Sequence, residues 1–184
     1  MLQSFLVHKP RKHQKALACL APHEGLDNQN HQLDISGGNE TVKYYFGLGY
    51  LDQPGLILNT WFKRASFRGN VDIKASSKLN IKLLLVANIP QTHNNNYGGG
   101  LLDPLNQALL WDPTSLIRDP STGNFITNGR FGSIGFNPIA QAENRTHDNI
   151  NTNISGSAIF TYKILNDLSF TSTNVYDINA GHAQ

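Results

Sequence analysis

The sequence predicts an all-β fold, an antiparallel up-and-down meander of about six long strands with long loops on one side. Three observations lead to this prediction. From residue 31 onward, apolar and polar side chains alternate with the period of two that is typical of strands. The connections between these segments are alternately short and long along the chain. The chain is also rich in turn formers, with 21 Asn and 16 Gly, whereas charged residues make up only 15%, below the roughly 25% of an average soluble domain.

The first thirty residues show no such alternation, and we expect residues 1–30 to form an irregular or non-native N-terminal extension. Basic residues precede an apolar run at 16–21, an order that imitates a secretory signal. This run is shorter than the roughly 7–15 residues of a signal peptide's apolar region, and no clear cleavage site follows it. We therefore predict no clear signal peptide, and a folded part that spans residues 31–184.

The first four predicted strands form two hairpins. Residues 31–36 and 41–50 alternate on either side of a Gly-Gly-Asn turn, a combination that favours a tight hairpin. Residues 66–74 and 79–86 alternate in the same way around a short Ser-Ser-Lys turn. These two pairs are separated by a longer connection.

The last two predicted strands, residues 153–164 and 168–178, form a third hairpin around an Asn-Asp turn. The connections between hairpins are longer and cover residues 51–64 and about 88–150. Outer-membrane barrels have short periplasmic turns at one end and longer extracellular loops at the other. The order of short and long connections therefore favours a segment of a transmembrane β-barrel, with residues 88–150 as a loop of the extracellular type.

The two faces of the predicted strands differ in charge. The apolar sides of the last five strands hold 25 positions, and none is charged. The strands are about 9–13 residues long, close to the roughly 9–11 of membrane-spanning strands. A soluble sandwich would alternate as well, so alternation alone does not separate the two architectures. The opposite sides carry the charged residues Lys43, Arg68, Asp72, Lys74, Lys82, Lys163 and Asp177.

Several functional classes find no support in the sequence. Fifteen Lys and Arg face thirteen Asp and Glu, so there is no basic surface for nucleic acid. The single Cys and the spacing of the seven His match no common metal site, and no nucleotide-binding or nucleophile motif occurs. Asp103, Asp112 and Asp119 each precede Pro, which favours turn initiation over a pair of catalytic acids. We predict neither enzyme activity nor a cofactor.

The long segment at 88–150 is the expected place for ligand contacts. Tyr97, Trp111, Phe125 and Phe131 could stack on sugar rings, with the surrounding Asn side chains binding hydroxyl groups. The alternative is that each of these aromatic residues packs inside the loop, because a loop of this length needs a small core of its own. A short helix is expected at 103–110, with Pro104 in its first turn.

Five segments in order resemble the SusC-like (SusC/RagA) TonB-dependent outer-membrane transporters. Residues 36–40 and 43–55 are similar to the family's "SGG-x-E" and "YY-x-x-LGY-x-x-Q-x-G" stretches. Residues 62–72 resemble its "FKR…R-x-NVD" continuation, residues 136–140 its "NP-x-A" loop, and residues 162–170 its "Y-x-I-x-x-GL-x-F" hairpin. The agreement runs from about residue 31 to 178. Any one segment is a weak signal, whereas the ordered set is specific.

The resemblance implies a 22-stranded barrel around an N-terminal plug, usually paired with a SusD-like surface lipoprotein. It also implies a TonB complex as the energy source, outer-membrane lipid as a partner, and import of oligosaccharides, peptides or other large nutrients. Six strands close neither a barrel of 22 strands nor one of eight, so we expect a segment of a barrel wall in the outer membrane of a Gram-negative cell. Two alternatives remain: a soluble all-β glycan-binding module, and a non-functional truncated gene product.

Overall fold

The computed structural model describes residues 27–95, 103–112, 114–127, 129, 136–145 and 147–183. They fall into two compact units. The sheet unit comprises 27–54, 61–93 and 148–183, and the loop unit comprises 55–60 together with the described part of 94–147. Most of the expected N-terminal extension lies outside the described residues.

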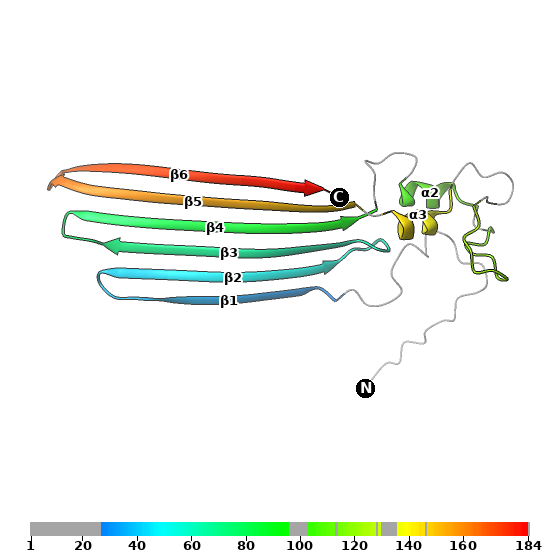
Figure 1. Ribbon diagram of the computed structural model, residues 1–184. Helices are drawn as coiled ribbons and strands as arrows, with labels where there is room; N and C mark the ends of the chain where they lie inside the picture. Colours follow the sequence, from blue (N-terminus) through cyan, green and yellow to red (C-terminus); the bar gives the residue numbers. More distant parts are fainter. Residues whose placement is uncertain are drawn as a thin grey trace, which may run out of the picture. The chain divides into compact units, whose positions relative to one another are not determined.

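The sheet unit is a single six-stranded sheet in which each strand pairs with its neighbours in the sequence (Figure 1). It is an antiparallel meander that does not close on itself, as the sequence predicts. The strands are β1 (Gln29–Gly38), β2 (Val42–Pro54), β3 (Trp61–Lys74), β4 (Leu79–Asn94), β5 (His147–Leu165) and β6 (Leu168–Ala183).

Tight turns join the strands within each hairpin, at one end of the sheet that we call the turn end. Between β1 and β2, Gly38 has φ +144°, and a Cβ there would lie 2.3 Å from the carbonyl oxygen of Val42, so only glycine fits. The Asn39 side chain closes the same turn by accepting hydrogen bonds from the backbone N–H groups of Thr41 and Val42, both at 2.8 Å. The predicted hairpin turns are thus confirmed.

The strands are longer than the sequence analysis predicts, at 13 to 19 residues for β2 to β5. The second predicted strand ends at Tyr50 and the third begins at Ser66, but the backbone pairing of β2 with β3 continues past both residues. Asp52 of β2 lies opposite Lys63 of β3, and these two side chains form an ion pair at 3.1 Å. The connection between β2 and β3 is therefore only 55–60, and the long loop spans 95–146. We call the sheet end from which both leave the loop end.

The loop unit contains two short helices in contact, α2 (Pro104–Leu110) and α3 (Pro138–Asn144) (Figure 1). The helix predicted at 103–110 is confirmed: Asp103 caps it by accepting from the N–H of Leu105 at 3.1 Å, and proline occupies its first turn. The unit has a small core of its own, consisting of Ala108, Trp111, Ile139 and Ala142, with Ile57, Leu58, Ile117 and Phe125 packed against it.

Asn137 joins α3 to the preceding segments of the loop unit. Its side-chain oxygen accepts from the N–H groups at the start of the helix, and its Nδ2 donates to the carbonyl oxygens of Ile117 at 2.7 Å and Ile126 at 3.0 Å. Asn137 is 3% exposed, so these bonds are shielded from water. One buried amide therefore satisfies both a helix end and two backbone carbonyls.

Candidate functional site

The sheet has one apolar face and one polar face, set by the pairing of its strands. In the pairing of β1 with β2 and β3, Ile35, Phe46 and Gly69 share one face, whereas Asp34, Gly47 and Arg68 share the other. Between β4 and β5, the N–H of Lys163 donates to the carbonyl of Lys78 at 2.8 Å, which keeps the two faces continuous across the sheet. The large exposed side chains of the apolar face are Leu33, Ile35, Tyr44, Phe46, Leu48, Tyr50, Leu83, Leu85, Ile150, Phe160, Tyr162, Ile164, Leu168, Phe170, Tyr176 and Ile178.

The apolar face has the height of a bilayer core. On β4 its uninterrupted apolar positions run from Leu79 to Ile89. This stretch is about 33 Å long at roughly 3.3 Å per residue. A strand tilt of about 40° reduces it to roughly 25 Å, the height of the apolar band of outer-membrane barrels.

Polar and aromatic side chains border this apolar band at the loop end. The Trp61 and His93 rings stack with centroids 5.4 Å apart, and the Lys63 ammonium lies 5.1 Å from the Trp61 ring centroid. The His93 ring also pairs with the Asp148 carboxylate across β4 and β5. Amphipathic aromatic rings flanked by charges are typical of the membrane–water interface.

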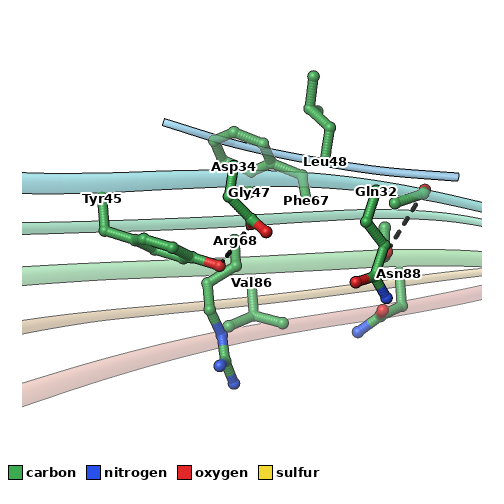
Figure 2. Close-up of a pocket in the computed structure, with 11 residues that line it drawn as sticks. Gln32, Asp34, Tyr45, Gly47, Leu48, Phe67, Arg68, Val86 and Asn88 are labelled. Carbon is green, nitrogen blue, oxygen red and sulfur yellow. Dashed lines mark hydrogen bonds between the residues drawn. The ribbon is translucent and has the colours of Figure 1, made fainter. Parts of the chain in front are cut away.

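The polar face has a hollow, which we call the glycine hollow, at the point where β2 carries Gly47 and Gly49 (Figure 2). Its volume is about 330 Å³, at the lower end of the range for ligand pockets. A Cβ on Gly49 would lie 2.5 Å from the Ser66 hydroxyl oxygen, and one on Gly47 would lie 2.8 Å from an Asp34 carboxylate oxygen. The two glycines therefore leave room above the strand for these oxygens, which form the floor of the hollow. The polar side chains around it are Gln32, Asp34, Tyr45, Ser66, Arg68 and Asn88.

An acid and a base flank the floor of the glycine hollow. The Tyr45 hydroxyl donates to Asp34 Oδ1 at 2.6 Å, which orients the carboxylate (Figure 2). Arg68 lies across Gly47 from Asp34, two strands away. Its exposed guanidinium has no hydrogen-bond or ion-pair partner among the residues that the structure describes. Figure 2 shows Leu48 pointing to the other side of the sheet.

The polar face as a whole is positively charged. In the described strands it carries six basic side chains and three carboxylates, and one of each is used in the ion pair between Lys82 and Asp72 at 3.7 Å. The basic residues are Lys43, Arg64, Arg68, Lys74, Lys82 and Lys163, and the acidic ones are Asp34, Asp72 and Asp177. This face therefore attracts anions.

The sequence analysis predicts ligand contacts at four aromatic residues, of which the structure describes two. Trp111 is 3% exposed in the loop core, and its Nε1 has no partner among the described residues. Phe125 is half-buried, with the Arg118 guanidinium carbon 3.8 Å from its ring centroid. Both pack as the alternative in the sequence analysis expects. Tyr97 and Phe131 lie outside the described residues, and ligand contact by any of the four stays a prediction.

Three further acidic residues of the loop unit take the role that the sequence analysis favours. Asp103 caps α2, the Asp112 carboxylate accepts from the N–H of Thr114 at 2.9 Å, and Asp119 accepts from the N–H of Ser121 at 2.8 Å. All three therefore initiate turns or a helix. In the part of the chain that the structure describes, no group of three His, Cys, Asp or Glu residues could hold a metal ion.

The residues of the glycine hollow are absent from the sequence-based site prediction. The available signal was the pair Gly47 and Gly49, which falls on the polar side of an otherwise well-filled strand. Glycine inside a strand often marks a close approach by another group.

None of the described helices is long and apolar enough to cross a membrane.

No family model matches the sequence, but comparison with known proteins finds similar ones, of which three are described. TonB-dependent receptor P26 of Formosa agariphila is 30% identical over 135 residues, which cover 72% of this chain and 13% of the receptor. TonB-dependent receptor P3 of the same organism is 24% identical over 151 residues, 78% of this chain and 15% of the receptor. The structure of the RagAB peptide transporter contains a chain with the same fold, with a TM-score of 0.65 and 20% identity over 93% of this chain and 19% of that one. The chain thus spans about one-seventh of the curated relatives' length.

Proposed function

The chain is similar in sequence and in fold to one segment of SusC/RagA-like TonB-dependent transporters, and from this premise we propose that it forms part of the barrel wall of an outer-membrane importer. The observation that carries the proposal is the division of the sheet into two faces. The apolar face contacts lipid over the height of a bilayer core, and the polar face lines the interior through which cargo passes.

The importer takes up oligosaccharides, peptides or other large nutrients and makes or breaks no bonds. Its energy comes from a TonB complex, and a SusD-like surface lipoprotein delivers the cargo at the loop end. These assignments are supported by the kinds of protein that the chain matches. The loop aromatics, Tyr97, Trp111, Phe125 and Phe131, are the candidates for cargo contact within the long loop.

Spin labels on opposite faces of the sheet test the proposal in outer-membrane vesicles from cells that make the protein. In a Cys19→Ser background, one label replaces Leu48 on the apolar face and another replaces Ser66 on the polar face. We expect the label at position 48 to collide with oxygen, which dissolves in lipid, but not with a water-soluble nickel chelate. The label at position 66 should collide with the chelate.

The same measurement separates the importer from a soluble all-β glycan-binding module. In a sandwich, the apolar face packs against a second layer, so the label at position 48 would be shielded from both oxygen and the chelate. That result would refute the barrel-wall proposal.

A further inference from the structure

We propose that the glycine hollow binds a carboxylate group of an acidic oligosaccharide, and that Arg68 is the residue that recognises this group. The inference rests on the proposed function, because it names the class of cargo that the polar face of the wall accepts. It concerns a site on the sheet itself, separate from the long loop.

The two charged side chains of the hollow differ in their pairing. Asp34 already accepts a hydrogen bond from Tyr45 at 2.6 Å. Arg68 has no such partner among the described residues, and its guanidinium carries several donors in a planar fork. A carboxylate matches this fork with two parallel hydrogen bonds. An anion with two oxygens therefore complements Arg68.

The floor of the hollow lies above two glycines of β2. Gly47 and Gly49 have no side chains, so Asp34 Oδ1, the Tyr45 hydroxyl and Ser66 Oγ lie above β2 and form a polar floor, with Arg68 beside it on β3. The spacing of neighbouring strands is about 4.8 Å, which places the backbones of β1 and β3 roughly 10 Å apart. The volume of about 330 Å³ is enough for a ring-sized group above these side chains.

The surroundings of the hollow carry further positive charge. Arg64 lies on the same face of β3 as Arg68, and its side chain is likewise exposed and without a partner among the described residues. With basic side chains outnumbering carboxylates on this face, an anionic chain gains attraction along its whole length. A neutral ligand gains none.

The chemistry of the remaining groups favours a saccharide over a peptide. Gln32, Ser66 and Asn88 offer side-chain amides and a hydroxyl, which both donate and accept hydrogen bonds, as sugar hydroxyls do. The backbone N–H and C=O groups of β2 are paired with β1 and β3. A peptide main chain therefore finds no strand to extend at this site.

The test uses the complete receptor in which this wall segment lies, purified in detergent, and isothermal titration calorimetry. The probes are tetragalacturonate, the neutral tetrasaccharide maltotetraose, and tetraglutamate as an acidic peptide. Arg68→Gln removes the charge and keeps a polar side chain. Lys163→Gln is the matched control, since it removes one positive charge from the same face at the turn end.

We expect Arg68→Gln to raise the Kd for tetragalacturonate roughly 10- to 100-fold, as the loss of charge-assisted hydrogen bonds predicts. Lys163→Gln should change this Kd less than about threefold, because exposed charges farther apart than roughly 10 Å are largely screened. Arg68→Lys keeps the charge without the fork and should recover part of the affinity. An unchanged outer-membrane yield of each variant shows that folding is retained.

Three results would overturn the inference. In the first, tetragalacturonate does not bind, or binds no more tightly than maltotetraose. In the second, Arg68→Gln and Lys163→Gln weaken binding equally, which would show that only the overall positive charge of the polar face matters. In the third, tetraglutamate binds at least as tightly with the same dependence on Arg68. After any of these three results, the importer proposal still stands if the spin label at position 48 contacts lipid. If that label does not contact lipid, both the importer proposal and the carboxylate site are refuted.

Discussion

Two adjacent leucines on β4 offer a direct measurement of what each face of the sheet contacts. Leu85 lies on the apolar face and is 42% exposed, and Leu84 lies on the polar face and is 38% exposed. The two residues share a type, a strand and nearly the same exposure. The two changes to lysine therefore differ only in the medium, lipid or water, that the new ammonium group enters.

The structure determines the expected magnitude for each change. Leu85 is close to the middle of the apolar stretch of β4, and a lysine at the midplane of a bilayer costs about 2–4 kcal/mol in a barrel wall. Leu84 faces the polar side, where its neighbours across the strands are Asn70 and side chains of β5. A lysine there enters water, and its cost should stay within about 0.5 kcal/mol.

Guanidinium unfolding of the proposed receptor in lipid vesicles measures both free energies. We expect Leu85→Lys to lower the free energy of unfolding by about 2–4 kcal/mol and Leu84→Lys to leave it nearly unchanged. Equal losses for the two variants would refute the assignment of one face to lipid. A larger loss for Leu84→Lys would reverse the assignment of the faces.

Three further predictions concern the loop unit and the edge of the apolar band. Asn137→Ala should destabilise the loop unit by about 2–4 kcal/mol, because a helix cap and the partner of two buried carbonyls are lost together; hydrogen exchange should quicken there and not in the strands. The hydroxyl and N–H of Ser121 lower the pKa of Asp119 below 3.8, so its stabilising effect is complete above that pH and disappears as the pH falls through the lower folded pKa. Carboxyl NMR titration should show the pKa rising in Ser121→Ala, and no change would contradict the hydrogen bond. The last prediction uses tryptophan fluorescence of the 184-residue chain on vesicles of brominated lipid, which quenches rings close to the membrane. The fluorescence of Trp61, measured in Trp111→Phe, should be quenched, and that of Trp111, measured in Trp61→Phe, should not. Equal quenching would contradict the position of Trp61.

The sequence predicts the number, order and hairpin pairing of the strands because each depends on local information. Alternation defines a face, and a turn sequence such as Gly38-Asn39 fixes where the chain reverses. The strand ends are less predictable. Asp52 and Lys63 interrupt the apolar pattern, yet they pair with each other across β2 and β3, and the backbone ladder continues past them.

The glycine hollow could not be predicted because it depends on register. Asp34 and Arg68 are far apart in the sequence and flank one glycine only because β1, β2 and β3 pair with one particular offset. The role of Trp111 is unpredictable for a similar reason. A tryptophan in a long loop suits either a ligand or a core, and the contact with α3 residues such as Ile139 and Ala142 decides for packing in this structure.

The two outer strands have a consequence for how such a sheet enters a membrane. Within the described sheet, β1 with ten residues and β6 with sixteen each pair on one side only. Each backbone group that meets hydrocarbon without a partner costs several kcal/mol. In the proposed barrel wall, each edge strand therefore has to be paired before or while it passes into lipid. An edge strand that has no partner is a template on which a further strand can pair.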